Sequence, residues 1–306
     1  MKISIIGSGN VGALTAMRLA ESRLGNVVLI DVIKGIAIGK ALDMEDAQAL
    51  VKNNYSVNAS DDISLIKDSN IVVITAGLAR KPGMTREELL LKNSSILKEL
   101  SLKIRELAPK SIVIVVTNPL DLMTYLVLKT TGFKHNKIIG MGVSLDTSRF
   151  ANIISKELNI NVSDIKAIVI GSHGESMLPL PRHSYIKDAN LKDMLDTQKQ
   201  EYLLKKTINR GAEIVSNLGT GSAFFAPSAA IAEIVNAICK DQNAIIPACA
   251  YLNGEYGIKD ISIGVPCCIG KDGIEKIVEL KLDQEEKEKL NKSAESIRQL
   301  TKNLPI

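Results

Sequence analysis

The sequence predicts an α/β protein in which a doubly wound parallel sheet is followed by an α+β domain. In the first half, short β-branched runs bounded by turn residues alternate with helical patterns, and this alternation stops near residue 143. Strands that are apolar throughout, with helices between them, are typical of a parallel sheet covered on both faces. The predicted strands are Lys2–Ile6, Val27–Asp31, Ile71–Thr75 and Ile112–Thr117.

Helices are predicted between these strands wherever apolar residues recur every three or four positions, as in Val11–Ser22 and Arg86–Leu107. No linker or repeat separates the halves, so we expect two tightly packed domains, residues 1–143 and 144–306. Within Tyr256–Leu282, short runs broken by glycine and proline predict a small antiparallel sheet. The other elements predicted for the second half are a helix Asp146–Leu158, a strand Ile165–Ile170 and a helix-rich stretch Lys199–Asn217.

Composition excludes several classes of protein. The 306 residues are 45% hydrophobic and 24% charged, without a long apolar run or a cationic-then-apolar start, so we expect a soluble cytoplasmic protein with no membrane partner. The net charge of +4 is small and its Lys and Arg are scattered, so no nucleic acid partner is expected. The four cysteines lack metal-ligand spacing, so no metal is expected, and we interpret them as small buried hydrophobes.

A glycine-rich turn directly follows the first predicted strand. In the run G-S-G-N-V-G, Gly7 permits a tight turn, Gly9 lets a pyrophosphate approach the backbone, and Gly12 lets the next helix pack closely. The helix would then point its amino end at the phosphates. A glycine-rich turn without a ligand is the alternative, but the position between strand and helix favours a dinucleotide-binding Rossmann domain.

Asp31 ends the second predicted strand, nineteen residues after Gly12 (31 − 12 = 19). A carboxylate at this position accepts hydrogen bonds from the adenosine ribose and repels a 2′-phosphate. The sequence therefore favours NAD over NADP.

Four polar segments lie where predicted strands meet loops, at residues 75–86, 116–121, 144–150 and 171–175. They contain T-A-G-L-A-R-K-P-G-M-T-R, T-N-P-L-D, L-D-T-S-R-F and G-S-H-G-E. Together with the glycine-rich turn, and in this order and spacing, they make the whole chain resemble the lactate/malate dehydrogenase family.

The resemblance implies a role for each of four residues. His173 is the proton donor and acceptor and Asp146 holds it, while Arg149 grips the substrate's α-carboxylate and Arg86 polarises the reacting carbonyl. The chemistry also needs these residue types, because hydride addition to a ketone puts negative charge on oxygen that a cation must stabilise and an acid must protonate. Taken singly, each residue could instead be a structural histidine, a helix cap or a surface arginine.

The resemblance further implies that Asn118 hydrogen-bonds the substrate and that NAD is held by Gly7, Ser8, Gly9, Asn10, Val11, Gly12, Asp31, Asn93, Val116, Thr117 and Asn118. Two residues depart from the family's common pattern: Ser172 and Glu175 stand where Gly and Asp are usual. Neither removes a reacting group, although Glu175 leaves the details of the pH optimum open.

The substrate follows from Arg80, because Arg at this position in the family accompanies oxaloacetate and Gln accompanies pyruvate. A second carboxylate in a closed site needs a cationic partner, and Ala223 leaves room for the longer substrate. We therefore expect reversible oxidation of (S)-malate to oxaloacetate in the tricarboxylic acid cycle by a homodimer or homotetramer. Lactate or another 2-hydroxy acid is the alternative substrate; an NAD-dependent glycoside hydrolase and a non-catalytic NAD-binding module are the other classes considered.

Overall fold

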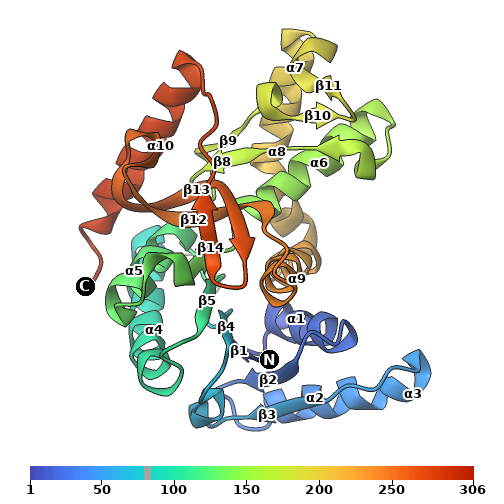
Figure 1. Cartoon of the computed structure of the whole chain (residues 1–306), viewed down its shortest axis with the longest axis vertical. Coiled ribbons are helices and arrows are strands. Elements are labelled where there is room, and N and C mark those ends of the chain that lie inside the picture. Colours follow the sequence, from blue (N-terminus) through green and yellow to red (C-terminus); the bar gives the residue numbers. More distant parts are fainter. Residues whose placement is uncertain (79–83) are drawn as a thin grey trace.

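The structure, a computed structural model, describes residues 1–78 and 84–306, apart from the side chain of Arg86. A large sheet passes through the middle of the molecule, with helices on both sides of it (Figure 1). Its first part consists of parallel strands in the order β3-β2-β1-β4-β5-β6, so the chain winds outward from β1 in both directions. The predicted doubly wound sheet is confirmed. The strands are β1 (Lys2–Ile6), β2 (Asn26–Ile30), β3 (Val57–Ser60), β4 (Ile71–Ile74), β5 (Ile112–Val115) and β6 (Ile138–Gly140).

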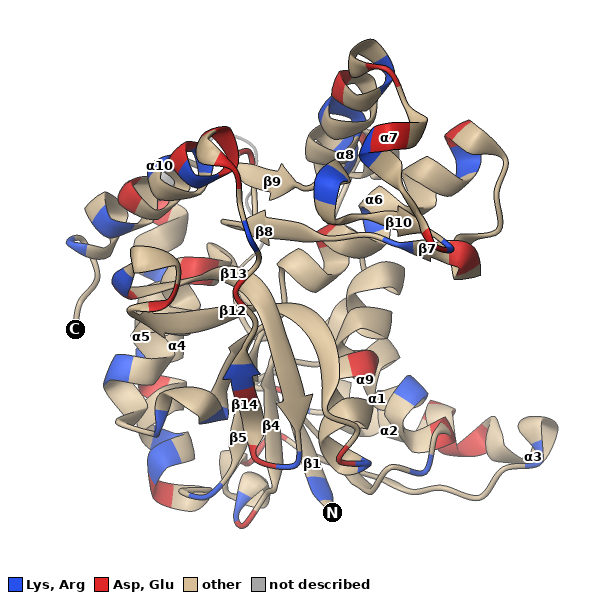
Figure 2. Ribbon diagram, turned by 45° about the horizontal axis from the view of Figure 1, so that its top comes forward, with Lys and Arg blue, Asp and Glu red and all other residues tan. Residues whose placement is uncertain are grey.

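The helices of the first half cover both faces of this sheet. In Figures 1 and 2, α4 and α5 lie on one side, whereas α1 and α2 lie on the other side together with α9 from the second half. Helix α4 begins at a capping box, in which the side chains of Thr85 and Glu88 each accept the other's main-chain N–H. The elements are α1 (Asn10–Glu21), α2 (Ile36–Asp46), α3 (Gln48–Val51), η1 (Ile63–Ile66), α4 (Arg86–Leu107), α5 (Leu120–Thr131) and η2 (His135–Lys137).

The second half combines helices with antiparallel strands. It includes a separate small sheet in the order β11-β10-β7, beside the long helix α8. Its helices are α6 (Val143–Leu158), α7 (Leu191–Met194), α8 (Thr197–Leu218), α9 (Phe225–Cys239) and α10 (Gln284–Thr301), with η3 (Val162–Asp164), η4 (Pro181–His183) and η5 (Glu255–Gly257). Its strands are β7 (Ile165–Lys166), β8 (Val169–Gly171), β9 (Met177–Pro179), β10 (Tyr185–Ile186), β11 (Ala189–Asn190), β12 (Ala244–Asn253), β13 (Lys259–Gly270) and β14 (Gly273–Ile277).

The large sheet continues into the second half. β12 pairs with β6 at the single register position Cys249–Gly140, and β13 pairs with β12 and then with β8 at Gly264–Gly171. The antiparallel strands predicted within Tyr256–Leu282 are present as β13 and β14, which pair with each other, but they do not form a small sheet of their own. β13 and β14 of that region extend the main sheet, because the unpredicted strand β12 is buried on both faces and connects them to β6.

The two halves are in direct contact. One apolar cluster contains residues from the first-half strands and from α9, β12, β13 and α10, and a second cluster surrounds Phe150 on α6. A polar contact crosses between the halves where Arg18 Nε of α1 donates to Ser228 Oγ of α9 at 2.9 Å. Of the cysteines, Cys249 and Cys267 are buried, whereas the other two are partly exposed. Among the described residues, no helix is long and apolar enough to cross a membrane.

Candidate active site

The glycine-rich turn lies at the carboxyl end of β1, where the strand order reverses between β1 and β4. Gly7 has φ +103°, and a Cβ there would lie 2.6 Å from the main-chain nitrogen of Ala76. A Cβ on Gly12 would collide with the carbonyl oxygen of Gly7. By contrast, no other side chain or loop of the described residues comes within 4 Å of the Cβ position of Gly9. The protein itself leaves the space over Gly9 open, as the approach of a pyrophosphate requires.

Asp31 directly follows β2 and its side chain faces the same turn. Its Oδ2 accepts hydrogen bonds from the N–H of Ser8 at 2.7 Å and from the Ser8 hydroxyl at 2.8 Å, and its Oδ1 accepts from Ile33 N–H at 3.0 Å. Burial raises the pKa of Asp31, but these hydrogen bonds and the charge of Lys40 outweigh it, so the pKa is below its ordinary value. Asp31 is therefore ionised beside the turn, and these residues fit an adenosine ribose without a 2′-phosphate.

Two further loops are tied together at the same edge of the sheet. The hydroxyl of Thr117 donates to Ala76 O at 2.6 Å, and the buried Asn93 on α4 donates from Nδ2 to Asn118 O at 2.7 Å. Asn93 Oδ1 also accepts from Leu78 N–H at 2.8 Å. The amide of Asn93 therefore holds the loop after β4 against the loop after β5. The side chain of Asn118 is exposed beside this junction.

His173, Asp146 and Arg149 come together in the second half, as their predicted roles require. His173 Nδ1 lies 2.7 Å from Oδ2 of the fully buried Asp146, whose Oδ1 accepts from Arg149 Nη1 at 3.2 Å. Their close approach depends on Gly142 before α6, because a Cβ at that position would lie 2.9 Å from His173 Cβ. Arg149 Nε is buried without a hydrogen-bond partner among the described residues, and the side chain as a whole is 11% exposed.

The surroundings of His173 favour its protonated form. Burial lowers the pKa of His173, but the charge of Asp146, the hydrogen bond to it and the charge of Asp121 together raise the pKa above its ordinary value. The charge of Arg149 acts in the opposite direction and is the smallest of these effects. With Nδ1 held by Asp146, Nε2 is the nitrogen left for proton exchange.

Asp121 is a site residue that sequence reasoning missed. It lies in the first turn of α5, and its Oδ2 accepts from the main-chain N–H of His173 at 2.9 Å. The available signal was its position at the end of the polar segment T-N-P-L-D, where an acid at the start of a helix indicates a favourable helix terminus and not a contact 52 residues away.

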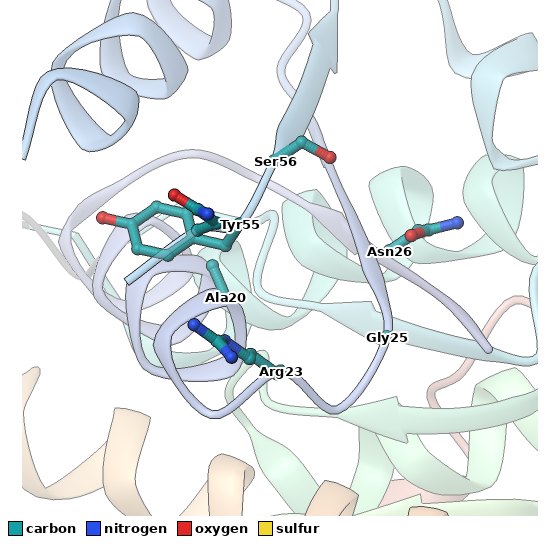
Figure 3. A pocket seen from close by; sticks show the side chains of 7 residues that line it. Ala20, Arg23, Gly25, Asn26, Tyr55 and Ser56 are labelled. Atoms are coloured by element: carbon teal, nitrogen blue, oxygen red, sulfur yellow. The ribbon is translucent and has the colours of Figure 1, made fainter. Parts of the chain in front are cut away.

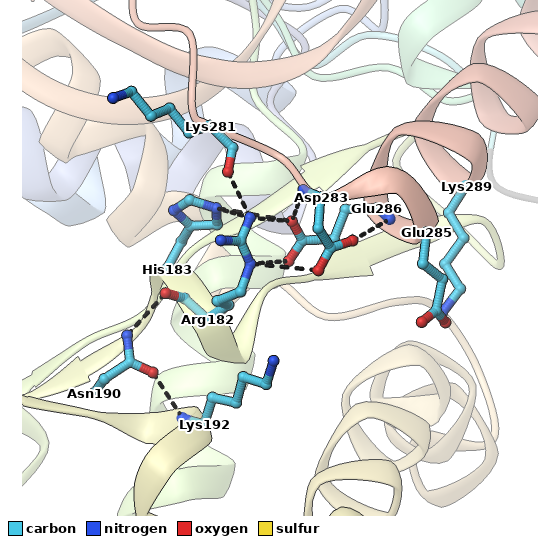
Figure 4. Close-up of polar contacts among 9 residues, drawn as sticks. All are labelled: Arg182, His183, Asn190, Lys192, Lys281, Asp283, Glu285, Glu286 and Lys289. Carbon is cyan, nitrogen blue, oxygen red and sulfur yellow. Dashed lines mark hydrogen bonds and ion pairs between the residues drawn. The ribbon is translucent and has the colours of Figure 1, made fainter.

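The loop that carries His173 is also supported by the last helix. Ser172 N–H donates to Ser293 Oγ of α10 at 3.0 Å. Figure 4 shows how α10 is attached: Arg182 of η4 contacts Glu286 at 2.7 Å and Asp283 at 3.4 Å, and its Nη2 donates to Lys281 O. The side chain of Ser172, noted as a departure from the family pattern, makes its own contact, a 2.8 Å hydrogen bond between the hydroxyls of Ser172 and Ser176.

Some of the predicted residues fall outside this description. Arg80 lies among residues 79–83, outside the described residues, and the side chain of Arg86 at the start of α4 is likewise not described. Ala223 lies in the loop before α9 and is partly exposed.

A surface hollow of about 470 Å³ is not part of this site (Figure 3). It is lined by Arg23, Asn26 and Tyr55 among others. Asn26 is the first residue of β2, so the hollow lies at the amino ends of the parallel strands, at the opposite edge of the sheet from Gly7.

Comparisons with known proteins identify the family of this chain. The family described as lactate/malate dehydrogenase, NAD binding domain, matches residues 1–140, and the alpha/beta C-terminal domain of the same family matches residues 143–304. A malate dehydrogenase from Methanosarcina barkeri is 48% identical over 305 residues, covering 100% of this chain and 99% of that relative.

Solved structures give the same result. The malate dehydrogenase of Cryptosporidium parvum has a TM-score of 0.96 at 38% identity, covering 99% of this chain and 98% of its own. The lactate dehydrogenase of the same organism, solved with lactic acid and NAD, has a TM-score of 0.94 at 37% identity, covering 99% of this chain and 97% of its own. The chain therefore belongs to the lactate/malate dehydrogenase family and is an NAD-dependent oxidoreductase.

Proposed function

We propose that this protein reversibly oxidises (S)-malate to oxaloacetate, with His173 as the proton acceptor and donor and Asp146 as the residue that orients it. The observation that carries the proposal is the 2.7 Å contact between His173 Nδ1 and the buried carboxylate of Asp146. A buried carboxylate fixes the imidazole tautomer and stabilises the imidazolium that forms when the substrate hydroxyl loses its proton.

Each protein group has a defined part in this reaction. The residues of the glycine-rich turn and Asp31 hold NAD, which supplies the hydride acceptor when bound. His173 takes the hydroxyl proton at Nε2, since Nδ1 is engaged by Asp146. Arg149 binds the α-carboxylate as a charge-assisted pair, because Asp146 contacts both this guanidinium and the His173 ring and so holds them close together. Asn118, exposed at the junction held by Asn93, hydrogen-bonds the substrate oxygen.

The choice of malate over lactate rests on two features of the sequence, Arg80 and the small residue Ala223. Arg80 pairs with the distal carboxylate and Arg86 polarises the carbonyl. The similar proteins named malate dehydrogenase support this choice. The same proposal includes a role in the tricarboxylic acid cycle, a cytoplasmic location, assembly as a homodimer or homotetramer, and a domain boundary between residues 143 and 144.

The test compares oxaloacetate with pyruvate as oxidants of NADH, in wild type and in Arg80→Gln, by absorbance at one pH. We expect the wild type to prefer oxaloacetate. Losing the charged partner of the distal carboxylate costs roughly 3–5 kcal/mol, so Arg80→Gln should lose about 10²–10³ in kcat/KM for oxaloacetate and gain activity with pyruvate. A preference for pyruvate in wild type would indicate a lactate dehydrogenase. An unchanged substrate ratio in Arg80→Gln would show that Arg80 does not meet the substrate.

A further inference from the structure

Asp121 connects the NAD-binding half of the chain to the catalytic histidine. It lies on α5, three residues after Asn118, and its side chain is buried. Its Oδ2 accepts the main-chain N–H of His173 at 2.9 Å. Since His173 lies in the loop after β8 in the second half, this bond fixes the position of the His173 main chain relative to the cofactor-binding loops.

The charge of Asp121 acts on the same histidine. Three groups face its carboxylate: His173, Asp146 of α6 and the thiol of Cys249 of β12. Burial raises the pKa of Asp121 and outweighs the lowering by the charge of His173 and by the Cys249 thiol, so the resulting pKa is about 6 and the group is mostly ionised at neutral pH. In turn, the charge of Asp121 raises the pKa of His173, although this effect is smaller than that of burial and those of Asp146.

The hydrogen bond alone does not account for a carboxylate at this position. Asp121 Oδ1 is buried and has no hydrogen-bond partner of regular geometry in the described part of the chain, although the Cys249 thiol interacts with the carboxylate. A neutral Asn would accept the same N–H without the cost of burying a charge. We therefore infer that the negative charge of Asp121 has a function that offsets the free-energy cost of burying it.

We propose that Asp121 is a positioning residue for the proton transfer: its hydrogen bond holds His173 against the NAD-binding half, and its negative charge, together with that of Asp146, favours the imidazolium. This inference rests on the proposed role of His173. The oxidation of malate needs neutral His173 and the reverse reaction needs the imidazolium, so the charge sets the pH range in which each direction operates.

The test uses Asp121→Asn, which keeps the acceptor and removes the charge, and Asp121→Ala, which removes both. Asp62→Asn is the matched control, because Asp62 is an exposed carboxylate that only caps the short helix η1 of the same half. Because the chain has three histidines, ¹³C-labelled histidine gives a resolvable NMR titration, and His173→Asn identifies the His173 signal. The second readout is the pH profile of kcat/KM in both directions.

In Asp121→Asn we expect the pKa of His173 to fall by about one unit. The rising limb of the pH profile for malate oxidation and the falling limb for oxaloacetate reduction should both move to lower pH by the same amount. The maximal rate should stay within about threefold of wild type, whereas Asp121→Ala should lose tenfold or more, about the effect of a misplaced proton donor. If Asp121→Asn fails to fold, Asp121→Ser provides a smaller neutral acceptor with the same expected pKa shift.

An unchanged His173 pKa and unchanged limbs in the neutral variant would overturn the inference, even if its rate were lower, because a purely structural residue affects rate without moving a pKa. Failure of the proposed function gives a different result. In that case wild type shows no malate-dependent NAD reduction, or His173→Asn retains it, while the NMR titration still reports whether Asp121 acts on His173.

Discussion

Replacing Asp146 by Asn removes one charge from the centre of the site while keeping the size of the side chain. In the structure, Asp146 is fully buried, with Oδ2 2.7 Å from His173 Nδ1 and Oδ1 accepting from Arg149 Nη1 at 3.2 Å. Both partners therefore lose a charged acceptor in one substitution. The new amide can also present its NH₂ group to Nδ1, which favours the tautomer with the proton on Nε2 and blocks the nitrogen that must accept one.

The size of the effect follows from the charge separation. Opposite charges about 4 Å apart attract by about 4 kcal/mol at an effective dielectric constant near 20, equivalent to about three pH units. Because the His173 side chain is 17% exposed and solvent screens part of this attraction, we expect the pKa of His173 to fall by about two units. If about half of that change in proton affinity appears in the rate, kcat/KM falls roughly tenfold above neutral pH. The tautomer with the proton on Nε2 lowers the rate further, to a total loss of about 10²–10³.

The assay is kcat/KM for malate with NAD and for oxaloacetate with NADH, from about pH 5 to about pH 10. Both directions should lose the same factor if cofactor affinity is unchanged, and both limbs should move to lower pH. His173→Asn sets the residual rate without the proton acceptor. Asp164→Asn is the control, because Asp164 is a partly exposed carboxylate of the same half whose ion-pair partner is Lys187. A loss below about threefold with unmoved limbs would refute the reasoning.

Two further predictions concern Asp31 and the stability contribution of Asp121. Asp31→Ser removes the ionised carboxylate beside the glycine-rich turn. The ratio of kcat/KM with NAD to kcat/KM with NADP should therefore fall by about 10–100-fold. An unchanged ratio would show that residues other than Asp31 determine the preference for NAD. A carboxyl whose folded pKa is raised from 3.8 to about 6 contributes stability below pH 3.8 that is lost as pH rises through 6. Asp121→Asn should therefore have a free energy of unfolding about 1–3 kcal/mol above that of wild type between pH 5 and 8, measured by denaturant unfolding. An unchanged free energy of unfolding would contradict a buried charge at Asp121.

Local patterns predicted the first half of the fold well. The β-branched strands, the glycine-rich turn and Asp31 are each encoded within a few neighbouring residues, and the structure has β1 and α4 at their predicted bounds. β12 was not predicted, although the polar run 240–243 before it is a turn signal, because the apolar run Ala244–Asn253 has no alternation and periodicity alone cannot tell such a run from a buried helix. Its position between β6 and β13 depends on contacts more than a hundred residues apart in the sequence.

The site divides in the same way. His173, Asp146 and Arg149 could be singled out because their segments resemble known motifs, and the structure places them together. Asp121 stands in the T-N-P-L-D segment but was given no role, and Ser293 was not singled out, because each acts through the main chain of the loop around His173, a contact that local sequence does not show. The hydrogen bonds by which Asn93 connects the loops after β4 and β5 could not be predicted either. A buried Asn in a helix indicates only that it has some hydrogen-bond partner.

The junction between β6 and β12 has a consequence for how the protein is made. When the ribosome has synthesised the first six strands, β6 is an open sheet edge, and its partner strand emerges only roughly 100 residues later. An open edge invites pairing with another chain. β6 is only three residues long, Ile138–Gly140, which makes it a poor template for such pairing. The shortness of this strand therefore protects the nascent chain from aggregation until its second half arrives.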